Sequence, residues 1–202
     1  MALAVYGDLD VTVIDELPPG RGTHTTTVVE EHDRKSVLDR IARRIREGEQ
    51  GFLICPALEE SDHGLANVAS VASEMRNLMG NKAAVAVLTG RTERRQRERI
   101  LREFASKRIG LIVATTVVEV GMDIESATIL VVEQADRFGL SQLHQMRGRV
   151  ARGSKDSVSY FIISESASEI AKQRLKVLEE TFDGFRVAEH DLAMRGPGDL
   201  VG

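Results

Sequence analysis

The chain has 202 residues, of which 42% are apolar and 29% charged, as is usual for a globular protein in water. This length suffices for one domain with a small appendage and excludes two full domains. The net charge of −4, taken as a total, argues against a nucleic-acid binder. Its single cysteine, Cys55, excludes an internal disulfide. No apolar stretch approaches the roughly 18 residues of a membrane span, so we expect a cytoplasmic protein without membrane contacts.

The first 22 residues show no regular pattern. Val11–Ile14 resembles a strand, but Leu17-Pro18-Pro19-Gly20 breaks it, and no capping or turn signal precedes the first apolar residues. We expect residues 1–22 to be an interdomain linker segment that is flexible, or paired with a neighbouring chain, in this fragment.

From Thr25 onward, short apolar runs alternate with segments of helical spacing. Such alternation predicts βαβ units, right-handed crossovers and a parallel sheet. The strands are continuous apolar runs, which indicates that helices cover both faces of the sheet. The predicted strands are Thr25–Val29, Gly51–Cys55, Ala84–Leu88, Ile109–Ala114, Thr128–Val132 and Val158–Ile163. The predicted helices are Arg34–Glu47, Leu65–Met79, Thr92–Ser106 with Thr92 as N-cap, and Ser141–Val150.

After Ser164 the alternation stops. Two helical segments, Ser168–Thr181 and Phe185–Leu192, are separated by an Asp-Gly turn, and Arg195-Gly196-Pro197-Gly198 ends the second. This pattern predicts a C-terminal helical hairpin. We therefore expect an α/β domain over residues 23–164, and over residues 165–202 the hairpin with a loop that is cut short.

Three arginines and two glycines gather in Gln142–Gly153. In a helix, Arg149 and Arg152 share a face, and Gln145 lies one turn before Arg149. Two planar guanidiniums aimed in one direction suit a multiply charged anion such as a phosphate, and Gly148 allows a close approach of the backbone. The alternative is a surface helix with solvated arginines, but no acidic partners stand nearby in the sequence.

This pattern, Gln-x-x-Gly-Arg-x-x-Arg, resembles motif VI of superfamily 2 helicases. The resemblance implies a RecA-like fold in which Arg149 and Arg152 act as arginine fingers on the γ-phosphate of ATP, with Gln145 and Gly148 beside the nucleotide. Ala151 departs from the family pattern, where glycine is usual, but the change affects neither arginine.

A hydroxyl pair follows the predicted strand Ile109–Ala114. Thr115 and Thr116, with Gly121 and Asp123 after them, resemble motif V, in which the threonines contact the DNA backbone and the aspartate couples to the nucleotide ribose. On its own a Thr-Thr pair fits a plain β-branched strand end, and its place shortly before motif VI favours the helicase interpretation. Open α/β sheets bind ligands at strand ends, so we expect the motif VI arginines to project from a rim shared with Thr115 and Asp123.

Thr89, Gly90 and Arg91 follow another strand and resemble motif IV, which touches the tracked DNA strand. Many relatives have histidine at the position of Thr89, and a hydroxyl can also meet a phosphate. Between Arg91 and Arg108 there are eight basic residues and three glutamates. We expect the first turn of this helix to face DNA and the later arginines to be solvated.

The tail resembles the translocation motif shared by RecG-type helicases and the transcription–repair coupling factor. The matching segments are Gln173–Leu178, Asp183–Phe185 and His190–Leu200, and Arg174 and Arg195 match the motif's arginines. In that family the hairpin converts motor closure into movement along duplex DNA. The alternative is a hairpin that only packs on the sheet. Residues 6–21 resemble the segment between the two motor domains of RecG-type chains rather than that of the coupling factor.

A phosphate loop ending in Gly-Lys-Ser/Thr is absent, because no glycine in this chain is followed by lysine. Val13–Glu16 imitates a metal-binding Asp-Glu pair, but no phosphate loop precedes it. ATP and Mg²⁺ should therefore be held mainly by a preceding RecA-like domain, and we expect this fragment alone to be inactive. The five histidines form no close pair, so we expect no metal site.

The resemblance implies the second motor domain of a DNA helicase that remodels stalled forks and Holliday-type junctions. Its partners would be branched or duplex DNA and, in the same chain, the first motor domain and a wedge domain. The alternatives are a non-catalytic α/β binding module, the motor half of a coupling factor, and an RNA helicase half, which the translocation-like tail disfavours.

Overall fold

The computed structural model describes residues 22–56, 62–115, 126–150 and 155–195. They form a six-stranded sheet of order β1-β6-β5-β2-β4-β3, in which all neighbouring strands are parallel. The strands are β1 (His24–Glu30), β2 (Gln50–Cys55), β3 (Ala84–Leu88), β4 (Ile109–Thr115), β5 (Ala127–Val132) and β6 (Ser157–Ile163). The helices are α1 (Arg34–Arg46), α2 (Asp62–Met79), α3 (Arg94–Ala105), α4 (Leu140–Val150), α5 (Glu169–Glu180) and α6 (Gly184–Arg195).

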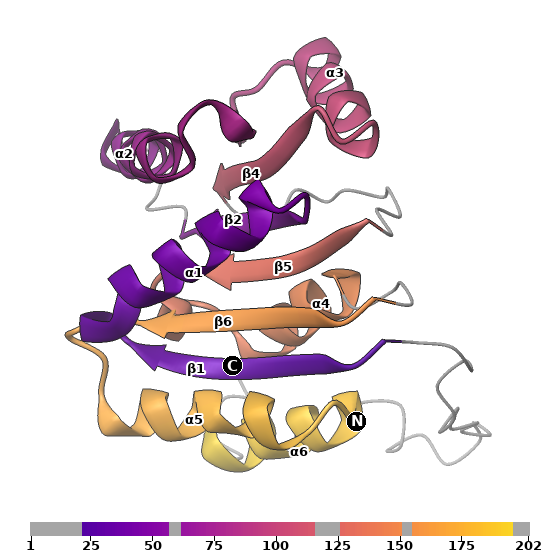
Figure 1. Cartoon of the computed structure of the whole chain (residues 1–202). Coiled ribbons are helices and arrows are strands. Elements are labelled where there is room, and N and C mark those ends of the chain that lie inside the picture. The colour runs from indigo at the N-terminus through magenta and orange to yellow at the C-terminus, as the bar shows by residue number, and fades with distance from the viewer. Residues whose placement is uncertain (1–21, 57–61, 116–125, 151–154, 196–202) are drawn as a thin grey trace.

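Helices cover both faces of the sheet, as predicted. The apolar residues of α1 and α2 pack on one face, and those of α3, α4, α5 and α6 pack on the other. In Figure 1, α1 crosses in front of the sheet and α4 lies behind it, while α5 lies along the outer strand β1 and α6 lies next to α5. The strands β4 and β5 are buried along almost their whole length, which explains their continuous apolar sequences.

The start of α3 differs from the prediction. The helix begins at Arg94 with Glu93 as N-cap, and Thr92 does not cap it. The hydroxyl of Thr92 instead accepts a hydrogen bond from the backbone N–H of Thr89 at 2.9 Å. A threonine hydroxyl can accept a hydrogen bond from a backbone N–H either at the start of a helix or in a turn. Here it accepts the bond in the turn. The strand-like residues 11–14 lie outside the described residues.

The parallel strands give the sheet two unlike edges. All strands begin at one edge, here called the amino edge, and end at the other, the carboxyl edge. A helix that connects two parallel strands has to return from the carboxyl edge to the amino edge. The two ends of each connecting helix therefore lie at opposite edges of the sheet.

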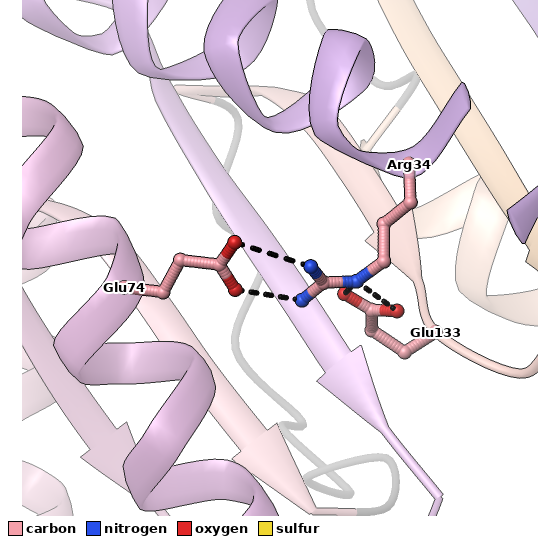
Figure 2. Close-up of polar contacts among 3 residues, drawn as sticks. All are labelled: Arg34, Glu74 and Glu133. Carbon is pink, nitrogen blue, oxygen red and sulfur yellow. Dashed lines mark hydrogen bonds and ion pairs between the residues drawn. The ribbon is translucent and has the colours of Figure 1, made fainter. Parts of the chain in front are cut away.

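A network of three charged residues braces the carboxyl edge (Figure 2). Arg34, at the start of α1, donates from Nε to Glu133 Oε1 at 2.9 Å, and Glu133 directly follows β5. The two terminal nitrogens of Arg34 donate to the carboxylate of Glu74 in α2, at 3.1 and 2.9 Å. The backbone N–H of Glu133 also donates to the carbonyl of Ile54 in β2. One guanidinium thus ties the end of β5 to both helices of one face.

Burial and hydrogen bonding together shift the pKa values of the residues in this network. Burial opposes the charge on Arg34, but hydrogen bonds to Glu74 and Glu133 outweigh it and raise the pKa of Arg34. The pKa of Glu133 is raised by burial, against the hydrogen bond from Arg34. The Glu133 side chain is 7% exposed and that of Glu74 is 39% exposed, so Glu133 depends far more on Arg34 than Glu74 does. Burial also raises the pKa of the neighbouring Cys55 thiol to about 12, as befits a buried structural cysteine.

Replacing Arg34 by methionine should therefore lower the free energy of unfolding by about 3–5 kcal/mol, because Glu133 would keep a buried charge without its partner. Glu74→Gln is the control and should cost less than about 1 kcal/mol, because this pair is partly exposed. Urea unfolding of the 202-residue chain measures both values. Equal losses for the two variants would contradict the role given to Glu133.

Candidate functional site

Two of the predicted DNA-contacting hydroxyls lie side by side at the carboxyl edge. Thr115 is the last residue of β4, and Thr89 directly follows β3. These strands are neighbours, and the register pairs Leu88 with Ala114, which places Thr89 next to Thr115. Both side chains are half-buried. The structure thus brings together two segments that are more than twenty positions apart in the sequence.

The segment from Thr89 to Thr92 forms a tight turn at this edge. The N–H of Thr92 donates to the carbonyl of Thr89 at 3.0 Å, and the N–H of Arg91 donates to the Thr89 hydroxyl at 3.3 Å. Gly90 and Arg91 are exposed. A Cβ built on Gly90 would meet no atom within 4 Å, so nothing within the described residues requires glycine there. The open backbone suits the close approach of an external group.

The helix α4 presents different residues on its two faces. Its inner face buries Leu143, Met146, Arg147 and Val150, which follow the spacing of a core-facing helix. Gln145 and Arg149 are both exposed and stand four residues apart, so they share the outer face as predicted. Among the described residues, a Cβ on Gly148 would also meet no atom within 4 Å. The outer face of the last turn therefore offers a guanidinium beside open backbone.

The expectation that Arg149 projects from a rim shared with Thr115 is wrong; Arg152 and Asp123 lie outside the described residues. Helix α4 follows β5 and precedes β6, and these two strands are parallel neighbours. Its last turn, which carries Arg149, therefore lies towards the amino edge, whereas Thr115 lies at the carboxyl edge (Figure 1). The prediction placed Arg149 on a helix, but it assigned the end of that helix to the strand-end rim, whereas the last turn of a returning helix lies towards the opposite edge.

Several predicted site residues lie outside the described residues: Thr116, Gly121, Asp123 and Arg152. The backbone of α6 includes Arg195, but its side chain is also outside the description. The roles predicted for these residues stay predictions.

Arg174 is half-buried and joins the hairpin to the sheet side of the domain. Its Nη2 donates to the backbone carbonyls of Asp136 and Phe138, at 3.2 and 3.1 Å. These carbonyls belong to the turn that connects β5 to α4. The carboxylate of Asp136 in turn accepts hydrogen bonds from the backbone N–H and hydroxyl of Ser164, at the end of β6. The structure thus places Arg174 at a junction between α5 and the entry to α4.

Arg147 is a residue of this region that is not among the predicted site residues. Its side chain is fully buried, and burial lowers the pKa of Arg147 to about 10. It was counted with Arg149 and Arg152 because the three are close in sequence. The apolar spacing of Leu143, Met146 and Val150 could have placed Arg147 on the inner face instead.

The described residues hold no cluster of three or more histidine, cysteine or acidic side chains that could bind a metal ion. Among the same residues, no helix combines the length and apolar character needed to cross a membrane.

Comparison with known proteins assigns this arrangement to a family. The helicase conserved C-terminal domain family matches residues 33–154. The chain is 39% identical over its whole length to the ATP-dependent DNA helicase RecG of Bacillus subtilis, of which it covers 30%. It is 42% identical over its whole length to the RecG helicase of Synechocystis, of which it covers 24%.

Solved structures agree with this assignment. The structure of RecG bound to a three-way DNA junction matches 98% of this chain, and 26% of that chain, at 36% identity and a TM-score of 0.79. Domain 2 of the DEAD-box helicase Mss116p, solved with an RNA duplex, has the same fold, with a TM-score of 0.61 over 79% of this chain and 61% of that one, at 15% identity. The predicted RecA-like fold is confirmed. The chain spans less than a third of the RecG relatives it matches.

The lowered pKa of His144 provides a test of the packing around Arg147. His144 Nδ1 accepts a hydrogen bond from Arg147 Nη2 at 2.9 Å. Burial and the Arg147 charge lower the pKa of His144, against Asp183. A lowered folded-state pKa means that the unfolded chain binds the proton first, so this contribution to stability is complete above the ordinary histidine value of 6.5 and is lost below it.

We therefore expect the stability difference between the wild-type chain and the variant His144→Gln to shrink as the pH falls from about 7.5 to about 5.5. Urea unfolding at each pH measures this difference. A difference that stays constant over the range would show that His144 is not held neutral.

The open space at Gly148 gives a second test. Replacing Gly148 by alanine should raise the free energy of unfolding of the 202-residue chain by up to about 1 kcal/mol, since alanine favours the helix and its Cβ would meet no described atom within 4 Å. Urea unfolding measures the change. A lowered free energy of unfolding would show that folding itself requires glycine at this position.

Proposed function

This chain belongs to the helicase conserved C-terminal domain family and is of the RecG type, and from this we propose that it forms the second motor domain of an ATP-dependent DNA helicase. In this proposal the domain completes a nucleotide site that a first motor domain largely builds. The exposed Arg149, on the outer face of α4 beside the open backbone of Gly148, is the observation that carries the proposal.

Arg149 would act as an arginine finger, with Arg152 as its partner. A guanidinium on a rigid helix can stabilise the negative charge that builds on a transferring phosphoryl group. Gln145, exposed one turn earlier on the same face, would orient the nucleotide. Arg149, Gln145 and the backbone at Gly148 would thus contribute charge and shape to a phosphate that another domain holds.

The opposite edge of the sheet would hold the DNA backbone. Thr89, Gly90, Arg91 and Thr115 lie together there, with hydroxyls, open backbone and an exposed guanidinium. Groups of this kind contact phosphates rather than bases, so the grip would not depend on sequence. This property suits a motor that moves along any duplex.

The chain would supply only part of the nucleotide site. Its sequence contains no phosphate loop, so the first motor domain would bind the magnesium ion and the other phosphates of ATP. When bound, ATP supplies the free energy for movement. The hairpin of α5 and α6 would transmit this movement through Arg174 and Arg195, and the complete enzyme would remodel stalled forks and branched DNA.

Replacing Arg149 by alanine in the complete helicase should reduce DNA-stimulated ATPase turnover by about 10³-fold or more, as loss of an arginine finger does. Binding to branched DNA should persist, because the DNA contacts lie at the other edge. Steady-state ATPase assays and DNA mobility shifts measure the two effects.

Arg40→Ala is the matched control, since Arg40 is exposed on α1, across the sheet. The 202-residue chain alone serves as a blank and should hydrolyse no ATP. Wild-type turnover in the Arg149 variant, or robust turnover by the purified chain alone, would refute the proposed division of the site.

A further inference from the structure

Arg147 occupies a core position of α4 and is among the largest fully buried side chains of the described residues. The neighbouring positions on this face are Leu143, Met146 and Val150, where apolar side chains fill the space. No carboxylate of the described residues lies within ion-pair distance of Arg147, and burial alone accounts for its lowered pKa. Burying a guanidinium without a counter-charge is costly, so packing does not explain why this position is an arginine.

Three contacts of the Arg147 guanidinium are with residues of the α5–α6 hairpin. Nη2 donates to the carbonyl of Thr181 at 2.9 Å, and Nη1 donates to the carbonyl of Leu178. Both carbonyls belong to the C-terminal end of α5, where backbone oxygens lack helical partners and the helix dipole is negative. The Phe182 ring in the α5–α6 connection lies over the guanidinium, with Cζ 3.8 Å from its centroid, a cation–π contact.

Two further groups fix the orientation of the two terminal nitrogens of the Arg147 guanidinium. Nη1 also donates to the hydroxyl of Thr26 in β1 at 3.3 Å, and Nη2 donates to His144 within α4. The guanidinium therefore contacts α4, α5, β1 and the α5–α6 connection at once. A lysine could satisfy only part of this set, because its donors lie at one point.

Arg174 makes the reciprocal connection. It reaches from α5 to the carbonyls of Asp136 and Phe138 in the turn before α4, whereas Arg147 reaches from α4 to the carbonyls at the end of α5. Two arginines thus cross between the same two helices in opposite directions. We call this pair, with its four carbonyls, the arginine clasp. Two separated attachment points resist both sliding and rotation of α5 against α4.

We propose that Arg147 is a positioning residue that locks the α5–α6 hairpin to the helix carrying Arg149. This inference rests on the proposed function and adds a residue to it. Arg147 and Arg149 are two positions apart on opposite faces of α4, so any rotation of α4 that follows the nucleotide also moves the clasp. The clasp makes helix and hairpin one rigid unit, and its loss uncouples hydrolysis from movement.

The test uses the complete helicase with Arg147→Met, which keeps the length of the side chain and removes the fork. Turnover of ATP on duplex DNA and base pairs moved per ATP are measured together. We expect kcat within about threefold of wild type, because Leu143, Met146 and Val150 still seat α4. Base pairs moved per ATP should fall at least about fivefold, the size of a typical coupling between sites.

Three comparisons make the outcome decisive. Arg40→Met, the same change at an exposed position of α1, should leave the ratio unchanged. Arg147→Lys keeps the charge without the fork and should lose coupling as the methionine variant does; wild-type coupling in it would overturn the inference. If Arg147→Met lowered turnover and movement in equal proportion, Arg147 would be only a structural residue and the proposal would be wrong.

A separate result decides the proposed function itself. If Arg149→Ala abolishes turnover while both Arg147 variants keep normal coupling, the finger assignment holds and the clasp fails. If Arg147→Met is too unstable to purify, the lysine variant carries the same test, with thermal melting of the complete helicase confirming that it is folded.

Discussion

The direction of the strands governs where this molecule can place its functional groups. All six strands of the described sheet run the same way, so each connecting helix carries the chain from the edge where strands end to the edge where they begin. Hydroxyls that directly follow strands, at Thr89 and Thr115, gather at the first edge. A side chain in the last turn of a returning helix, such as Arg149, belongs to the second. The proposed DNA contacts and the proposed nucleotide contact would therefore lie at opposite edges of the sheet.

The sequence predicts the fold well because its strands are buried on both sides and its helices are amphipathic. Continuous apolar runs therefore identify the buried strands, and apolar residues at helical spacing identify the buried faces of the helices. The predicted and observed elements differ mainly at their ends. Thr92 was assigned wrongly because its hydroxyl can serve a helix or a turn, and only the neighbouring backbone at Thr89 decides. The shared rim for Arg149 and Thr115 was wrong for a different reason: Arg149 lies in the last turn of a helix that returns to the amino edge, so the strand-end rule does not apply to it.

Residue type alone could not separate the arginines of α4 and α5. Arg149 is exposed, Arg147 is fully buried, and Arg174 is half-buried against backbone carbonyls. Arg149 lies on the exposed face of α4, whereas a guanidinium enclosed by carbonyls and an aromatic ring, such as that of Arg147, serves the protein's own architecture. The three environments follow from the position of each residue around its helix. In the proposed mechanism, one short stretch of sequence would therefore both contact the nucleotide and hold the hairpin.

The net charge of −4 does not oppose the proposed DNA contact, because charge acts locally. Fields decay over about 8–10 Å at physiological salt, so what matters is the balance near Thr89 and Thr115. The acidic residues Glu74 and Glu133 at the carboxyl edge share the charge of Arg34, which reduces the repulsion that they would exert on a phosphate. Next to Thr89, the exposed Arg91 leads into the arginine-rich helix α3. A chain with an acidic total can therefore present a basic surface where the proposed DNA backbone would lie.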